Sequence, residues 1–171
     1  MRQVNENDIE AVSEIFKNAK QSIRDMGVRQ WHNEYPNKQT VKDDIISGIG
    51  YVLEQDGLIA AYVAITTTEE YDYGFLYDGE WLTRGESYAT IHRIAVSNVF
   101  RGKGFSKRVF QNAEQISKEK GCRSIRVDTH PDNHIMRGLV TGSGYKYCGI
   151  IYLRTGDEAG DIRYCYEKII N

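Results

Sequence analysis

The chain has 171 residues, of which 27% are charged, and its formal net charge is −2. This length suits one domain that buries about 70% of the surface exposed by its unfolded chain, and the near-neutral charge provides no basic field for nucleic acid. No apolar run approaches the ~20 residues of a membrane span, and the N-terminal residues lack a signal-peptide core. We therefore expect a single domain over residues 1–171, located in the cytoplasm, with no nucleic-acid or membrane partner.

The N-terminal half predicts two helices. Asn5 or Asn7 can cap a helix over residues 9–26, in which apolar residues recur on one face. A second helix is expected to begin at Thr40, whose hydroxyl can cap it, and to close near Gly48.

A β-hairpin is expected next, because two strand-like runs over residues 51–55 and 58–66 flank the dipeptide Asp56-Gly57. Alternation in the second run predicts that four of its side chains share one face, namely Ile59, Ala61, Val63 and Ile65.

Residues 69–86 are rich in acidic and aromatic side chains. One interpretation is an irregular loop with an edge hairpin, whose aromatic rings cover the sheet. The other is a wall of a binding site that attracts a cationic amine. The two interpretations are compatible.

Residues 90–106 carry the strongest functional signal. An alternating strand over 90–96 leads into the turn Arg101-Gly102-Lys103-Gly104, and helical spacing begins at Phe105. A helix N-terminus leaves backbone N–H groups without partners and carries positive dipole charge, so it can bind an anion. The two glycines let the main chain approach that anion closely.

The C-terminal part predicts three strands, over residues 123–128, 145–153 and 162–169, with a turn over 154–161 between the last two. The chain is thus expected to form an α/β fold with a mixed central β-sheet flanked by helices. We expect the C-terminal strand to be exposed, so that it could pair across a homodimer. The three cysteines Cys122, Cys148 and Cys165 show no metal-ligand spacing, so we expect reduced, buried thiols and no metal.

The segment 101–106 resembles the pyrophosphate-binding motif Arg/Gln-x-x-Gly-x-Gly/Ala of the GNAT superfamily of N-acetyltransferases, with Ser106 in its last position. The likeness extends over about residues 50–170, including an Asn-x-x-Met…Gly-Tyr pattern between Asn133 and Tyr145. It is not a dinucleotide fingerprint, because Lys107 stands where a third glycine is required.

This resemblance implies that acetyl-CoA is a co-substrate. Its pantetheine arm would pair with the strand edge at Ile94, Ala95 and Val96. The amides of residues 101–106 would hold the pyrophosphate, and Arg101 or Lys103 would reach other phosphates. The expected cofactor-binding residues are Ile94, Ala95, Val96, Arg101, Gly102, Lys103, Gly104, Phe105, Ser106, Asn133, Met136 and Arg137.

Acetylation of an amine requires a base, because an amine with a pKa near ~10.4 is mostly protonated at neutral pH. We expect His92 to be this catalytic base. Strand alternation places it on one face with Ile94 and Val96, and histidines at the matching position serve as base in some relatives that acetylate arylalkylamines. His130 and Asp128, at the end of the next strand, are alternatives.

The leaving thiolate requires a proton. Many family members carry a tyrosine seven residues after the asparagine, but this chain has Val140 there. Tyr145, Tyr147 or Tyr152 could replace it, or water could protonate the thiolate directly. Among these, Tyr152 is the predicted catalytic acid.

The connection between the first two helices is expected to shape amine selectivity, because in GNAT folds it lies over the acceptor cleft. Trp31 and Tyr35 would line this substrate-binding region, and Glu34 would pair with a cationic amine. Trp31 and Tyr35 could instead be packing anchors. The sequence thus predicts an acetyl-CoA-dependent N-acetyltransferase acting on a primary amine of a small molecule or peptide. The alternative is a non-catalytic acyl-CoA-binding sensor domain.

Overall fold

A computed structural model describes residues 1–156 and 158–170 of the chain. Three short 3₁₀ helices (Glu6–Asp8, Tyr71–Gly74 and Asn98–Phe100) supplement the main helices and strands. In chain order the latter are β1 (Arg2–Gln3), α1 (Ile9–Asp25), α2 (Lys38–Ile46), β2 (Gly50–Gln55), β3 (Leu58–Thr66), β4 (Tyr88–Val96), α3 (Phe105–Glu119), β5 (Ser124–Thr129), α4 (His134–Gly142), β6 (Lys146–Tyr152) and β7 (Ile162–Ile169).

In the described part of the chain, seven strands form one mixed sheet in the order β1-β2-β3-β4-β5-β7-β6. Only β4 and β5 run parallel, and every other neighbouring pair is antiparallel. The predicted α/β class with a mixed central sheet is confirmed. The expected exposure of the C-terminal strand is wrong, because β7 lies between β5 and β6, which leaves β6 as the edge.

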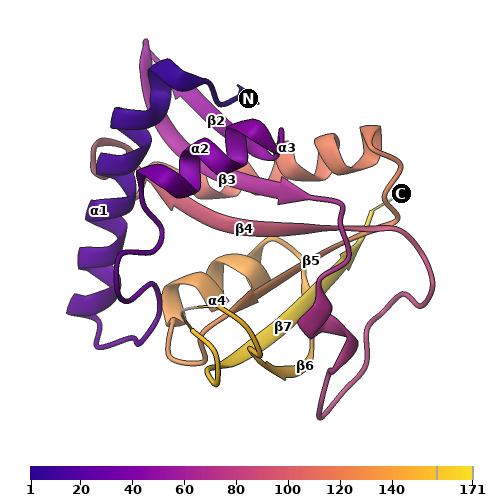
Figure 1. The fold of residues 1–171 in the computed structure, drawn as a ribbon. Coiled ribbons are helices and arrows are strands. Elements are labelled where there is room, and N and C mark those ends of the chain that lie inside the picture. Colours follow the sequence, from indigo (N-terminus) through magenta and orange to yellow (C-terminus); the bar gives the residue numbers. More distant parts are fainter. Residues whose placement is uncertain (157, 171) are drawn as a thin grey trace.

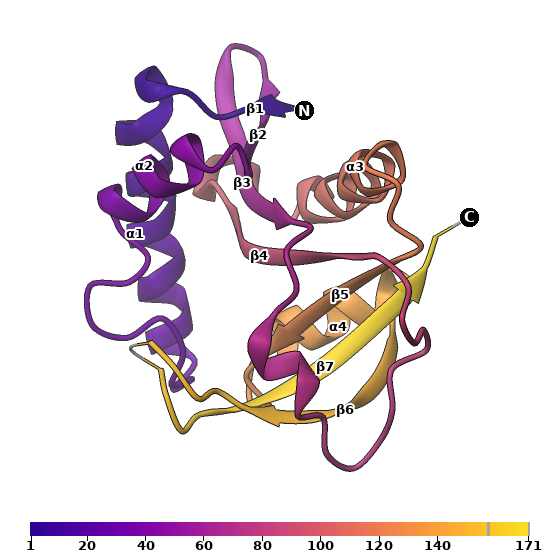
Figure 2. The ribbon, with the colours of Figure 1, turned by 45° about the vertical axis from the view of Figure 1, so that its right-hand side comes forward.

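The sheet separates at its centre. The parallel pair β4 and β5 is joined only from Tyr88–Thr90 to Ser124–Arg126, after which β4 continues without β5 as a partner. Figures 1 and 2 show the two strands diverging on the side of the molecule where α1 lies. A cavity lined by residues of both strands lies at this divergence.

Helices cover both faces of the sheet (Figures 1 and 2). On one face, α3 packs through its buried apolar residues, among them Val109 and Phe110, onto β3, β4 and β5. On the other face, Phe16 of α1 and Val41 of α2 pack onto β2 and β3. Burying a side chain of this size stabilises the fold by about 1.5–3 kcal/mol, so the two apolar layers fix the helices on either side of the cleft.

The predicted first helix is confirmed, and the cap predicted for the second is wrong. Asn5 caps the 3₁₀ turn that leads into α1. At α2 the cap is Asn37, whose side chain accepts hydrogen bonds from Gln39 N and Thr40 N, while Thr40 Oγ1 accepts one from Asn37 N. Thr40 is therefore the third helical residue of a capping box rather than the cap itself.

The hairpin over β2 and β3 is confirmed, with positive φ at both Asp56 and Gly57 as its turn requires. Of the four residues predicted to share a face, the last three lie in the cluster that packs on α3, but Ile59 packs on the opposite side. A bulge explains this: Leu53 pairs with Ala61 and Glu54 with Ile59, which leaves Ala60 as an extra residue. One inserted residue reverses the side-chain alternation.

The acidic and aromatic segment 69–86 forms a loop with one 3₁₀ turn, and a single bridge from Tyr77 to Ile150 stands in place of the expected edge hairpin. Its aromatic residues do cover the sheet, since the Arg126 guanidinium of β5 lies 4.1 Å from the centroid of the Trp81 ring, and Tyr73 packs with Ile151 and Cys165. The expected free, buried cysteines are confirmed. Asp157, part of the predicted turn 154–161, lies outside the described residues. Among those described, no helix has the length and apolar character needed to span a bilayer.

Candidate active site

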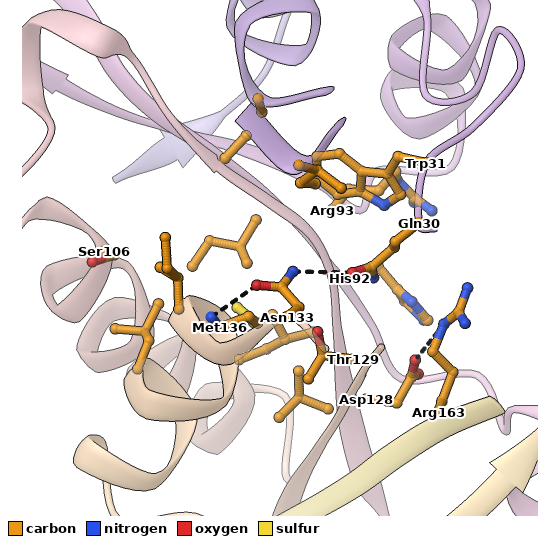
Figure 3. A pocket seen from close by; sticks show the side chains of 18 of the residues that line it. Gln30, Trp31, His92, Arg93, Ser106, Asp128, Thr129, Asn133, Met136 and Arg163 are labelled. Carbon is orange, nitrogen blue, oxygen red and sulfur yellow. Dashed lines mark hydrogen bonds and ion pairs between the residues drawn. The ribbon is translucent and has the colours of Figure 1, made fainter. Parts of the chain in front are cut away.

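The divergence of β4 from β5 opens into a cavity of about 930 Å³. Its lining comes from α1, β4, the start of α3, β5, α4, β6, β7 and the loops between them. Figure 3 shows Ser106 at one side of this cavity and Asp128 and Arg163 at the other. We refer to the part lined by residues 101–106 as the loop end and to the part lined by Glu70, Asp72, Asp128 and Glu158 as the carboxylate end.

The loop end is built from backbone. Gly102 and Gly104 have φ of 71° and 79°, and α3 begins directly after them. Its first intrahelical hydrogen bond runs from Arg108 N to Gly104 O (3.2 Å), so the preceding amides at the start of the helix are available to a ligand. A Cβ added at either glycine would meet no atom within 4 Å, which shows that open space lies beside the turn. These features fit a bound phosphate.

The two cations expected at the loop end behave differently. The Arg101 guanidinium lines the cavity and donates hydrogen bonds to Ser22 Oγ (2.6 Å) and Asn18 O (3.4 Å), both on α1. Lys103 is exposed, with its Nζ 5.8 Å from the centroid of the Phe100 ring, and it is not part of the lining. The turn at the loop end is thus connected to α1 through the Arg101 side chain.

The middle of the cavity is lined by Ile94, Ala95 and Val96 on one side and by α4 on the other. Asn133 caps α4: its Oδ1 accepts a hydrogen bond from Met136 N, and its Nδ2 donates one to Gln30 Oε1, each 3.0 Å long (Figure 3). Met136 lines the cavity as expected. Arg137 does not, because its guanidinium donates to Pro131 O (2.9 Å) and lies over the Tyr164 ring.

A bulge in β4 changes which way His92 faces. His92 pairs with Ala64 and Ala95 with Tyr62, so Arg93 and Ile94 together oppose a single residue of β3. Consequently Ile91 and Ile94 both pack with the cluster under α3, although they are three residues apart. The predicted face shared by His92, Ile94 and Val96 is wrong, because the extra residue reverses the alternation between His92 and Ile94.

His92 lines the cavity and is paired with Glu70, a residue of the loop between β3 and β4. The distance from His92 Nε2 to Glu70 Oε1 is 2.8 Å. Burial raises the pKa of Glu70, but the hydrogen bond to His92 and the electrostatic interactions with His92 and Arg93 together leave that pKa below its usual value. Because an ionised carboxylate can only accept, His92 Nε2 carries the donated hydrogen, and in the neutral imidazole Nδ1 holds the lone pair.

Glu70 is itself held in place, since its backbone N–H donates to the Tyr88 hydroxyl (3.0 Å). Tyr88 in turn packs against Arg126 and stacks on Tyr73. The loop that carries Glu70 is therefore anchored to β4 and β5 by side chains next to the histidine that it contacts.

Asp128 lies on β5 at the carboxylate end. Its Oδ2 accepts a hydrogen bond from the Tyr73 hydroxyl (2.8 Å), and its Oδ1 is 3.7 Å from Arg163 Nε (Figure 3). Burial raises the pKa of Asp128 in spite of the neighbouring Arg163 and the hydrogen bond from Tyr73. His130, one of the alternatives for the base, is not part of the lining; its Nδ1 accepts from Asp132 N (3.1 Å), and burial lowers its pKa.

The segment between α1 and α2 contributes Trp31 and Tyr35 to the lining, as expected. Glu34 is exposed and is not part of the lining. The carboxylate beside Trp31 is instead Glu158, which accepts hydrogen bonds from Trp31 N and from Arg163 Nη2 (2.7 Å). His32, Glu158 and Asp161 bring three potential metal-ligand atoms within 4.8 Å of one another, but both Glu158 oxygens already accept these hydrogen bonds.

The structure does not bring the candidate acids to the cavity. Tyr152 is 47% exposed and packs edge-on against Tyr77. Tyr145 is buried against Phe110, and Tyr147 packs on Tyr164 and Tyr166. None of these three tyrosines lines the cavity, although Ile151, which precedes Tyr152 on strand β6, does. Val140 is fully buried in the core.

Several lining residues were not singled out from the sequence, namely Glu70, Tyr73, Glu158 and Arg163. The acidic and aromatic composition of residues 69–86 pointed to the loop that carries Glu70 and Tyr73 but not to those two residues. No local sequence pattern pointed to Glu158 or Arg163. Glu158 lies in the turn before β7 and Arg163 lies on β7, both far along the chain from the glycine motif.

Comparisons with known proteins agree with this geometry. The model of the acetyltransferase (GNAT) family matches residues 12–145. YesJ of Bacillus subtilis (strain 168), described as an uncharacterized N-acetyltransferase, is 27% identical over 146 residues, which cover 83% of this chain and 78% of YesJ. The crystal structure of a GNAT-family acetyltransferase from Streptococcus agalactiae is 34% identical, with a TM-score of 0.89, and the match covers 99% of this chain and 94% of that one.

A more distant structural match is yncA from Salmonella typhimurium, whose structure contains its cofactor acetyl-CoA. It is 13% identical with a TM-score of 0.67, and the match covers 99% of this chain and 92% of that one, so it shows the fold. The chain belongs to the GNAT family of acetyltransferases. Members of this family use acetyl-CoA.

Proposed function

We propose that the protein transfers an acetyl group from acetyl-CoA to a primary amine of a small molecule or peptide. The observation that carries this proposal is the His92–Glu70 pair, which lies in the same cavity as a glycine turn able to bind phosphate. A proton acceptor and an anion site are the two requirements of this reaction that the chain itself must meet.

The residues of the cleft fit acetyl-CoA. The amides at the start of α3 and the Arg101 guanidinium would hold its phosphates, while the edge of β4 at Ile94, Ala95 and Val96 would hold its arm across from Asn133 and Met136. When bound, acetyl-CoA supplies the activated acetyl thioester. The β4 edge suits an extended arm because β5 pairs with only the first part of the strand.

The base is His92, which accepts the amine proton at Nδ1. Glu70 orients the ring through Nε2 and stabilises the positive charge that the imidazole then carries. Asp128 is the second candidate, but both of its carboxylate oxygens already have partners, Oδ2 the Tyr73 hydroxyl and Oδ1 the Arg163 guanidinium. The pairing with an ionised glutamate therefore favours His92.

No side chain is needed as the proton donor. A simple thiol has a pKa of about 8.5, so a thiolate is a moderate leaving group near neutral pH, and water can protonate it. This agrees with the positions of Val140 in the core and of Tyr152 outside the lining.

The acceptor is proposed to arrive as an ammonium ion at the carboxylate end. Glu70, Asp72 and Glu158 line this end, and one cation there, Arg163, is already paired with Glu158. Aromatic residues beside these carboxylates can also attract a cation through their rings.

The cytoplasmic location and a homodimer stay predictions from the sequence.

The test is thiol release from acetyl-CoA across a panel of primary amines, combined with calorimetric titration of acetyl-CoA. We expect binding and amine-dependent thiol release by the wild type, and binding without release by His92→Gln. Binding by the wild type without release for any amine would favour the acyl-CoA sensor, and failure to bind acetyl-CoA would contradict both functions.

A further inference from the structure

Arg93, at the β4 bulge, has an unusual backbone conformation. Its φ is +53°, in the left-handed region that residues with a Cβ seldom occupy within a strand. Such a conformation persists only where surrounding contacts determine it. The contacts that do so here are made by the Arg93 side chain, which is 13% exposed.

Two of these contacts reach α2. Arg93 Nε and Nη2 donate to the two carboxylate oxygens of Asp44, at 3.1 and 2.7 Å, in the two-pronged arrangement that only arginine offers. Asp44 is 4% exposed and also accepts a hydrogen bond of 2.5 Å from the Tyr62 hydroxyl. Tyr62 lies on β3, next to the bulge. One buried cluster therefore joins α2, β3 and the bulge.

The third contact reaches the segment over residues 27–36. Arg93 Nη1 donates to the Tyr35 hydroxyl, 3.0 Å away. Both residues line the cavity, as does Trp31 of the same segment. Figure 3 shows Arg93 and Trp31 across the cavity from Asp128 and Thr129. Arg93 thus links the strand edge at Ile94–Val96 to the 27–36 segment, which forms the wall of the cavity that faces the carboxylate end.

We propose that Arg93 is a positioning residue that holds the β4 edge and the 27–36 segment at a fixed separation. The catalytic part of this inference rests on the proposed function. In that function the β4 edge would hold the acyl arm and the 27–36 segment would hold the amine, so Arg93 would fix the distance between the thioester and the amine. Arginine satisfies Asp44 and Tyr35 at once, whereas lysine can supply only a single ammonium point.

The first test measures structure and needs no substrate. Hydrogen–deuterium exchange is compared among the wild type, Tyr35→Phe, Arg93→Lys and the control Tyr51→Phe, in which a tyrosine of the core outside the cavity is changed. Loss of one hydrogen bond should speed exchange of residues 27–36 about five-fold in Tyr35→Phe. Arg93→Lys should extend the effect to residues 91–96. Wild-type exchange rates in both segments of both variants would overturn the proposal.

The second test measures steady-state kinetics and acetyl-CoA binding, using an amine that the wild type acetylates. Tyr35→Phe should raise the KM for the amine about five-fold, with kcat and the Kd for acetyl-CoA unchanged. The reason is that only the 27–36 segment, which would hold the amine, loses a hydrogen bond. Arg93→Lys should also lower kcat, and Tyr51→Phe should match the wild type. Equal losses of kcat and acetyl-CoA binding in Tyr35→Phe would contradict the inference. If the wild type acetylates no amine, the proposed function fails, and the exchange experiment still decides the role of Arg93.

Discussion

The two ends of the cavity are built in different ways. The loop end is one continuous stretch, in which two glycines of positive φ lead into α3 and the ligand groups are backbone amides. The carboxylate end combines side chains from the β3–β4 loop, from β5, from the turn before β7 and from β7 itself. A site made of local backbone can be recognised from a short motif, whereas a site made of converging side chains is defined only once the chain has folded.

The same distinction explains which parts of the fold could be predicted. Hydrophobic periodicity predicted α1 and α3, and Asp56-Gly57 predicted the hairpin, because these signals are local. The bulges at Ala60 and Arg93 were not predicted, since they depend on the register of a neighbouring strand and on side-chain contacts from other elements.

The candidate site shows the same pattern. Gly102, Gly104 and Asn133 were predicted and line the cavity, because their motif spacing carries the information. Glu34 was predicted as the acidic partner of the amine, but Glu158 occupies that region, more than a hundred residues further along the chain. Only the tertiary structure brings Glu158 beside Trp31.

The largest effect is expected at the carboxylate end from His92→Gln, which preserves a polar side chain and removes the base. Loss of a general base lowers the rate by about 10²- to 10⁴-fold, and we expect such a fall in kcat/KM for the amine with the Kd for acetyl-CoA unchanged. Glu70→Gln should lose about 10-fold, because the orienting charge is removed while a hydrogen-bond acceptor remains. Steady-state kinetics and calorimetry measure both effects, with the exposed Glu34→Gln as the matched control. Wild-type kcat/KM in His92→Gln would exclude it as the base.

A complementary effect is expected at the loop end from Gly104→Val. A valine at φ 79° is strained by about 1–3 kcal/mol. If binding must restore the wild-type turn, this strain should weaken acetyl-CoA binding about 5- to 150-fold. Gly121→Val is the control, since Gly121 has φ of 78°, equally open surroundings and a position outside the cavity. Calorimetric titration should show weaker binding in the first variant only. A similar loss in both would indicate general destabilisation instead.

A smaller effect is expected from Trp31→Ala, which removes part of the lining beside Glu158. We expect the KM for the amine to rise about 10-fold and the ranking of amines to change, because a buried aromatic contact contributes about 1–2 kcal/mol to binding a cation. Glu34→Gln should leave the ranking as it is. Acceptor profiles measured by thiol release would reject this assignment if Glu34→Gln changed selectivity and Trp31→Ala did not.

The smallest effect concerns the stability that Asp128 contributes. Its pKa is raised on folding, so between its unfolded and folded pKa the native state binds more protons and wild-type stability falls as the pH rises. Asp128→Asn lacks this titration. The melting temperature of the variant relative to the wild type should therefore increase from pH 4 to pH 8, each unit of pKa shift being worth about 1.4 kcal/mol. An unchanged or opposite trend in calorimetric melting would show that Arg163 and Tyr73 stabilise the ionised carboxylate at least as much as burial penalises it.

The most direct test of the two-ended site follows the acetyl group itself. The protein is incubated with acetyl-CoA carrying an isotopically labelled acetyl group and with an amine selected by the panel, and the amine is analysed by mass spectrometry. We predict one labelled acetyl group on the amine nitrogen with the wild type, and almost none with His92→Gln at full acetyl-CoA occupancy. Labelled amine formed equally fast by His92→Gln, or thiol released with no label on the amine, would contradict the account.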